Sequence, residues 1–301
     1  MKDAEADASS FLETLARIGI GDWLPKGRFV PEVGVWVTGD TLDISFPESG
    51  VGVFERVDDH SFWFRHRNEV ISDVLKVQVP EHLPFFEVGS GSGVVVDHIR
   101  KTTNRPVASV EPIPAGAVAV ARRGVPVSFC GDLESLDLPN QCLPALGAFD
   151  VIEHLADPRS FLAECRRVLR SDGRLILTVP AYPGLWSEFD VWNGHFQRFT
   201  RESMRVLLSE SGFSVSHSTY FFSPLLLPAY VQRVFLPWVG RAAPKPVHDV
   251  NVQESLAPES KTLNGVLLLV HRLERAILRR VRVPFGTSIL VVAVPKSESV
   301  D

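Results

Sequence analysis

The residues best suited to chemistry surround a glycine-rich segment, EVGSGSG at residues 87–93. An apolar run typical of a strand precedes the segment and a helical pattern follows it, so the glycines form a turn between the two. Glycine at such a turn lets the backbone bend tightly and approach a ligand closely. A dinucleotide-binding turn would need glycine at positions 89, 91 and 94, but position 94 is valine. On its own, the segment fits either a ligand-binding loop or a plain tight turn.

Three carboxylates narrow the choice, because each stands at the end of a predicted strand. Glu111 lies 22 residues after Gly89, where a carboxylate accepts hydrogen bonds from both hydroxyls of a ribose. Asp132 stands where an acceptor can meet the exocyclic amine of adenine, and Glu87 precedes the loop and can face a cationic group. Each acid alone could be a solvated strand end. Together they indicate a ligand with a ribose, an adenine and a positive charge but no phosphates, which describes S-adenosylmethionine.

The elements that position these residues alternate between strands and helices from residue 60 onward. Apolar runs that begin near residues 83, 105, 125, 141, 174, 213 and 288 predict seven strands. Helical patterns at 61–75, 94–101, 115–123, 158–169 and 200–211 fall between them, and residues 171–173 are typical of a turn. The alternation predicts a mostly parallel sheet with helices on both faces, in which ligands bind beyond the carboxyl ends of the strands.

The N-terminal residues and the overall composition predict an extension before the sheet and limit the partners and the cellular compartment. Residues 33–37 and 42–46 alternate like the two strands of a hairpin, which predicts a small extension before the sheet. A net charge of −5 argues against a nucleic-acid-binding protein that relies on general charge attraction, so we expect no nucleic-acid partner. The three cysteines form no CxxC pair and no basic, apolar leader opens the chain, which indicates a cytoplasmic protein.

At this point the chain resembles the class I S-adenosylmethionine-dependent methyltransferases. The resemblance covers roughly residues 61–221 and 287–296, and its motifs are EVGSGSG (87–93), VEP (110–112), GD (131–132), FDVIEHLADP (149–158), RVLRSDGRLILTVP (167–180) and SILVVAVPK (288–296). Within that superfamily the chain is most similar to the bacterial small-molecule methyltransferases of types 11 and 23, through FWFRHRN (62–68) and LWSEFDVWNGHFQRFT (185–200).

The resemblance implies an α/β fold, a doubly wound, seven-stranded, mostly parallel sheet of the Rossmann-like methyltransferase type with a reversed last strand. It divides the chain into an N-terminal extension (1–60), a methyltransferase core (61–221), a helical lid (222–285) and the last strand with the tail (286–301). The implied cofactor-binding residues are Glu87, Gly89, Ser90, Gly91, Gly93, Glu111, Pro112, Asp132, Leu133, Asp150 and Arg67. The fourth strand departs from the family pattern, because it lacks the usual early acid, and we expect it to be irregular.

Methyl transfer requires the acceptor, the methyl group and the sulfur to be aligned in a dry pocket. A neutral hydroxyl or amine also needs a base. His154 follows the fourth predicted strand and His195 follows the fifth, and we predict that these two, with Glu153, form the catalytic group. The expected reaction is methylation of a small or amphiphilic acceptor at oxygen or nitrogen.

The same residues raise the question of a metal. Asp150, Glu153 and His154 stand at i, i+3 and i+4, with His195 arriving from elsewhere. The arrangement resembles one that holds a divalent metal in small-RNA 2′-O-methyltransferases and some quinone O-methyltransferases, and its ligands suit Mg²⁺, Mn²⁺ or Zn²⁺. Similar segments are frequent in family members without a metal, where the side chains only shape the loop. We therefore do not expect a metal, although the ligand set allows one.

Tyr182, Trp186 and Asp190 follow the fifth predicted strand, on the loop expected to meet the acceptor. Aromatic walls suit a hydrophobic or planar substrate. In the alternative interpretation, Trp186 only covers the edge of the core.

The insertion at 222–285 contains two apolar stretches, 221–240 and 263–283, that are too interrupted to predict a membrane span. The second predicts a helix with an apolar stripe and an arginine stripe, the latter formed by Arg272, Arg275, Arg279 and Arg282. Three interpretations stay open: a lid helix with its apolar stripe on the core and solvated arginines, a surface that rests on anionic membrane, and an arginine site for a phosphorylated acceptor.

Two other functions remain as alternatives. A nicotinamide-dependent oxidoreductase shares the strand, the glycine loop and the acid, but Val94 and the position of Glu87 disfavour it. A membrane-associated protein that binds S-adenosylmethionine without catalysis is the other alternative.

Overall fold

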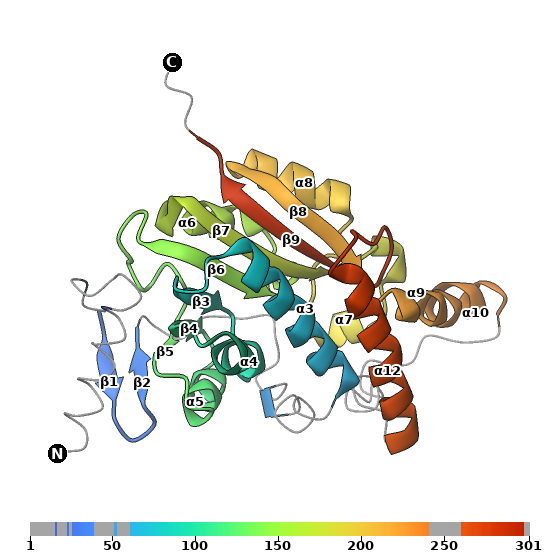
Figure 1. The fold of residues 1–301 in the computed structure, drawn as a ribbon, viewed down its shortest axis with the longest axis horizontal. Coiled ribbons are helices and arrows are strands. Elements are labelled where there is room, and N and C mark those ends of the chain that lie inside the picture. Colours follow the sequence, from blue (N-terminus) through green and yellow to red (C-terminus); the bar gives the residue numbers. More distant parts are fainter. Residues whose placement is uncertain are drawn as a thin grey trace.

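The computed structural model describes residues 16, 23, 26–38, 51–52, 61–240 and 260–297. Its centre is a nine-stranded sheet in the order β1-β2-β5-β4-β3-β6-β7-β9-β8 (Figure 1). The strands are β1 (Arg28–Val30), β2 (Val35–Val37), β3 (Phe85–Val88), β4 (Val107–Glu111), β5 (Ser128–Cys130), β6 (Leu143–Phe149), β7 (Leu169–Pro180), β8 (Phe213–Phe221) and β9 (Ser288–Pro295). Because β9 runs antiparallel to both of its neighbours, the predicted reversed last strand is confirmed.

The prediction of seven strands is wrong, because the N-terminal extension contributes two strands to the same sheet. Trp36 and Val37 of β2 pair in parallel with Phe129 and Cys130 of β5, and β1 pairs antiparallel with β2. The hairpin exists, but its partner strand precedes residue 33 instead of following residue 37. The predicted strand at 42–46 lies outside the described residues.

The fourth core strand, β6, is irregular as expected. Its register against β7 shifts between Leu143, which faces Leu169, and Ala145, which faces Arg174. Residues 170–173 therefore bulge out of the ladder inside β7, where the sequence predicts a turn.

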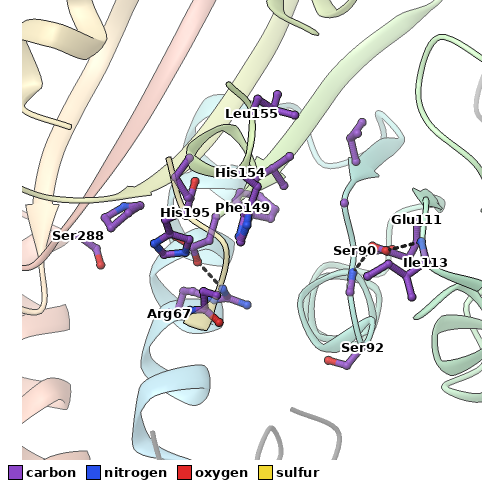
Figure 2. Close-up of a pocket in the computed structure, with 18 of the residues that line it drawn as sticks. Arg67, Ser90, Ser92, Glu111, Ile113, Phe149, His154, Leu155, His195 and Ser288 are labelled. Atoms are coloured by element: carbon purple, nitrogen blue, oxygen red, sulfur yellow. Dashed lines mark hydrogen bonds and ion pairs between the residues drawn. The ribbon is translucent and has the colours of Figure 1, made fainter. Parts of the chain in front are cut away.

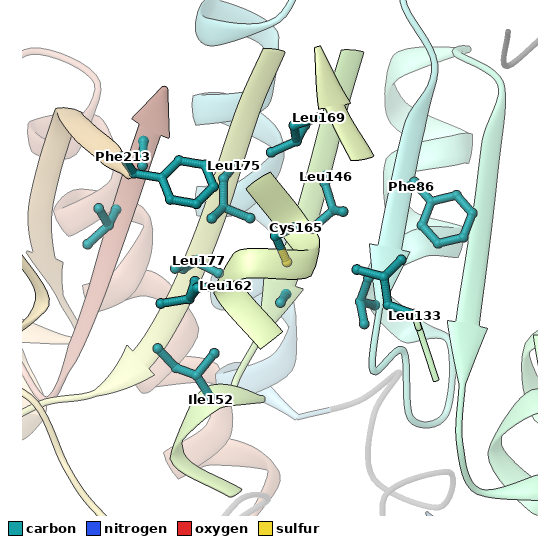
Figure 3. Close-up of a cluster of buried hydrophobic side chains, with 14 of the residues drawn as sticks. Phe86, Leu133, Leu146, Ile152, Leu162, Cys165, Leu169, Leu175, Leu177 and Phe213 are labelled. Carbon is teal, nitrogen blue, oxygen red and sulfur yellow. The ribbon is translucent and has the colours of Figure 1, made fainter. Parts of the chain in front are cut away.

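Helices cover both faces of the sheet, which confirms the doubly wound architecture. They are α3 (Phe62–Gln78), α4 (Val94–Thr103), α5 (Pro114–Arg122), α6 (Pro158–Val168), α7 (Glu188–Trp192) and α8 (Arg201–Glu210). Leu162 and Cys165 of α6 pack on Leu146 and Leu177 in one apolar cluster (Figure 3). A second cluster joins side chains of α3, α4 and α5 to the sheet. Helix α8 begins after the predicted cap, Thr200, whose side chain accepts the Ser203 N–H at 3.0 Å.

The insertion forms α9 (Ser223–Tyr230), a π-helical turn (Val231–Phe235), α10 (Leu236–Trp238) and the long α12 (Lys261–Leu278). Helix α12 packs on α3 and α9 at one end of the molecule (Figure 1). Arg275 and Arg279 each donate two hydrogen bonds, of 2.6–2.9 Å, to the carboxylate of Asp73 on α3. Of the three interpretations, a lid helix with its apolar stripe on the core does not fit, because Arg275 and Arg279 face α3 and most of the stripe faces outward. Within the described residues, no helix has the length and apolarity needed to cross a membrane.

Candidate active site

The glycine loop between β3 and α4 needs its glycines for two reasons. Gly89, Gly91 and Gly93 have φ angles of +70°, +53° and +77°, in a region that other residues rarely adopt. A Cβ on Gly89 would also lie 2.6 Å from Val151, and one on Gly93 would lie 2.9 Å from Val120. A Cβ on Gly91 would meet nothing within 4 Å. The loop is thus packed against the fold at both ends and open to a ligand at its centre.

Glu111, at the end of β4, is held in place by the backbone around it. Its carboxylate accepts the Gly91 N–H at 2.6 Å and the Ile113 N–H at 2.9 Å (Figure 2). Burial raises the pKa of Glu111 to about 7, although these two hydrogen bonds oppose the shift. Gly116 on α5 makes the contact possible, since a Cβ there would lie 2.7 Å from the Glu111 side chain. The sequence patterns did not identify Gly116, because its role depends on a contact between separate elements.

Glu87 is almost completely buried behind the loop. Burial and the nearby Glu111 raise the pKa of Glu87 well above its usual range, and Arg67 opposes them. Its Oε2 atom and the Ser90 hydroxyl have no hydrogen-bond partner among the described residues. Buried polar atoms without a partner are costly, so both fit a site that a polar ligand completes.

A cavity of about 630 Å³ opens beside these residues. Of the predicted cofactor residues, its lining includes Gly89, Ser90, Gly91, Glu111, Pro112, Asp132, Leu133, Asp150 and Arg67. Glu87 and Gly93 do not line it. The carboxylates of Glu111 and Asp132 and the unpartnered Ser90 hydroxyl line the cavity and can accept hydrogen bonds from hydroxyl and amine groups, so the acceptor chemistry of the cavity fits S-adenosylmethionine.

Arg67 and Asp150 meet on the cavity wall. The Arg67 guanidinium lies 2.5 Å from Asp150 Oδ2 and 4.7 Å from the centre of the Trp63 ring. Asp150 directly follows β6 with a φ of +57°, and its other oxygen accepts the Thr178 hydroxyl at 3.2 Å. Because Arg67 already has a carboxylate partner, binding the cofactor's carboxylate would require it to share or leave Asp150. Its role in binding cofactor stays a prediction.

The predicted catalytic residues come together at the opposite end of the cavity from Glu111 (Figure 2). The rings of His154 and His195 lie 4.7 Å apart and nearly perpendicular. Burial and the neighbouring His195 lower the pKa of His154 to about 3, so this imidazole is neutral at physiological pH. Glu153 is fully buried, and burial together with the nearby Asp150 raises its pKa well above the usual range. The three side chains place possible ligand atoms within 4.8 Å of one another.

Asp190, on α7, fixes the position of His195. Its Oδ1 atom lies 2.9 Å from Nδ1 of His195, and Arg198 binds both carboxylate oxygens at 2.8 and 3.0 Å. Burial opposes ionisation, but the hydrogen bond from His195 and the charge of Arg198 hold the pKa of Asp190 below its usual range. Asp190 itself does not line the cavity, so the structure places it behind the histidine and not against the acceptor.

The other two predicted substrate residues also lie off the cavity. Tyr182 stacks on Tyr220 with ring centres 5.2 Å apart, and Trp186 is 38% exposed. The cavity wall at this end is instead lined by Trp63, Phe189, Leu225, Ala229 and Arg233. Arg233 stands out in the sequence as the single charged residue within 223–238. That pattern alone does not predict that its side chain lies in the cavity wall.

Comparison with known proteins finds similar sequences. Residues 86–177 match the family described as "Methyltransferase domain". A probable S-adenosylmethionine-dependent methyltransferase of Mycolicibacterium smegmatis is 28% identical over 61% of this chain and 71% of its own length. The ubiquinone biosynthesis O-methyltransferase of Parvibaculum lavamentivorans is 28% identical over 36% of this chain and 44% of its own length. The chain therefore spans less than half of that second relative.

A solved structure agrees at the level of the fold. The methyltransferase in complex with the Haloferax volcanii Trm112 methyltransferase activator superposes with a TM-score of 0.56 at 15% identity, over 85% of this chain and 100% of that one. The matched domain at residues 86–177, with the glycine loop and the carboxylates at the strand ends inside or beside it, leads to one conclusion: the chain carries a class I S-adenosylmethionine-dependent methyltransferase domain.

Proposed function

We propose that this methyltransferase acts on the oxygen or nitrogen of an acceptor with an apolar body and an anionic group, and that His195 removes the acceptor's proton. One observation carries the proposal: His195, backed by Asp190, lies beside the neutral His154 on the wall of the cavity that the cofactor residues also line. A histidine oriented by a carboxylate is a common general base.

Different residues along the cavity bind the cofactor and accept the acceptor's proton. When bound, S-adenosylmethionine would supply a methyl group attached to a sulfonium. Loss of this methyl group turns the sulfonium into a neutral thioether. Glu111 and Asp132 would hold the ribose and adenine, and Glu87, which is buried behind the loop and outside the cavity lining, would act on the ammonium group only indirectly. His195 donates from Nδ1 to Asp190, which leaves Nε2 as the atom that accepts the proton. Asp190 stabilises the imidazolium that forms, and the neutral His154 adds no competing positive charge.

Arg233 supports an anionic acceptor. It lies in the cavity wall, and its one hydrogen-bond partner among the described residues is the Leu185 carbonyl at 3.1 Å. Burial and nearby Arg198 lower the pKa of Arg233 to about 10, so the guanidinium still carries its charge at neutral pH. Arg233 is partly buried and forms no ion pair with a described residue, so an acceptor carboxylate or phosphate would give it a direct charged partner. The name of the Parvibaculum relative supports transfer to oxygen.

The test is a methylation assay with matched acceptors. Purified protein is incubated with S-adenosylmethionine and an alkylated dihydroxybenzoate, the uncharged amide of the same compound, or an alkylated aminobenzoate. Mass spectrometry then measures S-adenosylhomocysteine and locates the methyl group. We expect the carboxylated acceptors to be methylated on oxygen or nitrogen. Methylation of the amide with an equal or lower KM would contradict the role of an anionic group.

Arg233→Gln provides the matched variant. It should raise KM for the carboxylated acceptor about tenfold or more, as expected for a hydrogen bond to a charged group, and leave KM for the amide unchanged. Arg205→Gln on the exposed surface of α8 is the control. Calorimetry with S-adenosylhomocysteine and with NADH tests the cofactor separately, and binding of NADH alone would overturn the whole assignment.

A further inference from the structure

The insertion presents an apolar surface to solvent that is built from two elements. On α12, the side chains at helical spacing Leu263, Val266, Leu273 and Ile277 are 49–63% exposed. On α9 and α10, Leu227 is 70% exposed and Trp238 is 80% exposed. Helices α9, α10 and α12 lie together at one end of the molecule (Figure 1), and we call their exposed apolar side chains the insertion face.

The outward orientation of α12 is fixed by polar contacts on its other side. Arg275 binds Asp73 of α3, and Asn264 accepts the backbone N–H of Phe62 at 3.1 Å. The buried Glu274 accepts the Ser223 N–H at 2.6 Å, and its second oxygen lies 2.9 Å from His66. Rotating the helix to bury Leu273 and its neighbours would break these contacts. The exposed stripe is therefore a built feature of the fold.

The charge around the insertion face has one sign. Residues 223–238 and 261–285 contain seven lysines and arginines and a single acid, Glu274, although the whole chain has a net charge of −5. Glu274 is buried, whereas Lys261, Arg272, Arg280 and Arg282 are exposed. None of these four has a carboxylate partner within the described part of the chain. The face therefore combines apolar and aromatic side chains with uncompensated positive charge.

We propose that the insertion face lies on an anionic lipid surface, with the apolar side chains at the boundary of the acyl chains and the basic residues among the headgroups. Amphipathic helices with this pairing bind such surfaces without crossing them. A second copy of the chain is a poorer occupant, because a two-fold interface would bring the two basic rims together. The charge complementarity favours phosphate-bearing lipid headgroups.

The proposal also connects the membrane to the active site. Helix α9 belongs to the insertion face and also reaches the cavity. Leu225 and Ala229 of α9, and Arg233 of the π-helical turn that follows it, line the cavity. An acceptor dissolved in lipid could therefore enter the cavity next to the bilayer. This last step rests on the proposed function, whereas binding of the insertion face to lipid does not.

Vesicle co-sedimentation of the full chain tests the proposal. We expect the protein to pellet with vesicles of phosphatidylcholine containing about one third phosphatidylglycerol, and to bind pure phosphatidylcholine far less. Arg272→Gln combined with Arg280→Gln and Arg282→Gln should weaken binding to the anionic vesicles about a hundredfold, since each basic residue near such a surface contributes about 1 kcal/mol. Leu273→Asp with Trp238→Asp should abolish binding even at low salt.

Val206→Asp is the matched control, because Val206 is 40% exposed on α8, away from the insertion. It should bind vesicles like the unchanged protein. Calorimetry with S-adenosylhomocysteine verifies that every variant is folded. Absence of pelleting with anionic vesicles at low salt would overturn the proposal. So would a stable dimer in sedimentation velocity that Leu273→Asp dissociates, and binding that is unchanged in the triple arginine variant. None of these results would affect the methylation assay with a water-soluble acceptor.

Discussion

Nδ1 of His195 lies 2.9 Å from Oδ1 of Asp190, a carboxylate with no exposed side-chain surface that also binds Arg198. The carboxylate thus fixes which ring nitrogen carries the proton and keeps Nε2 as the acceptor. The arrangement depends on α7, a five-residue helix that begins at Glu188, and on the segment that follows it. Sequence patterns place the two residues five positions apart but do not predict that they interact.

Replacing His195 should separate chemistry from cofactor binding. We expect His195→Gln to lower kcat about 100- to 10,000-fold, the range in which a general base contributes, while the affinity for S-adenosylhomocysteine stays the same. Single-turnover rates and calorimetry measure the two quantities. His82→Gln, an exposed histidine between α3 and β3, is the control. A variant that loses cofactor affinity and kcat together would contradict the assignment of His195 to the acceptor.

Cofactor affinity should depend on pH through Glu111. Its pKa of about 7 is raised above the usual value, so the carboxyl is protonated below this pH and ionised above it. If Glu111 binds the ribose as proposed, its ionised form would accept hydrogen bonds from both hydroxyls, and affinity for S-adenosylhomocysteine should therefore rise between pH 6 and pH 8. Calorimetry across this range should show a flat profile for Glu111→Gln. The same slope in the variant would assign the pH dependence to another group.

The sequence predicted the local features of the site well. The glycine loop, the acids at strand ends and the cap of α8 depend on neighbouring residues, and the structure has each of them. It did not predict features that depend on long-range contacts. The pairing of β2 with β5, the contact of Gly116 with Glu111 and the position of Arg233 in the cavity wall all join distant segments.

The orientation of helix α12 is another feature that depends on long-range contacts. Its apolar stripe was evident from the spacing, and burial is the usual fate of such a stripe. The direction in which it faces depends on Asp73 of α3, about 200 residues earlier, which attracts Arg275 and Arg279 to the opposite side. An amphipathic pattern gives the two faces of a helix, but only its partners decide which face is buried.

Metal removal should leave the activity unchanged. Glu153, His154 and His195 lie close enough to share an ion, but burial raises the pKa of Glu153 well above its usual range, which disfavours the charged form that would bind an ion. After exhaustive dialysis against EDTA, we expect full methyl transfer and the same affinity for S-adenosylhomocysteine. Metal analysis by mass spectrometry on the untreated protein is the companion measurement. Loss of activity that Mn²⁺, Mg²⁺ or Zn²⁺ restores would instead assign a metal to these three residues.

The contact that orients α12 should contribute measurable stability. Burial alone would raise the pKa of Asp73, but Arg275 and Arg279 lower it from 3.8 to about 2. Because the folded-state pKa is depressed, the stabilisation is present above pH 4 and is lost as pH falls toward 2. We expect Asp73→Asn to lower the free energy of unfolding at pH 7 by about 1–2 kcal/mol, discounted for partial solvent screening.

Urea unfolding at pH 7 and pH 3 measures this difference, which should shrink to about half at the lower pH. Asp172→Asn is the control, since Asp172 forms an exposed ion pair with Arg170, and such pairs contribute about 0.5 kcal/mol or less. A variant as stable as the unchanged protein at both pH values would show that packing, and not this ion pair, orients the helix.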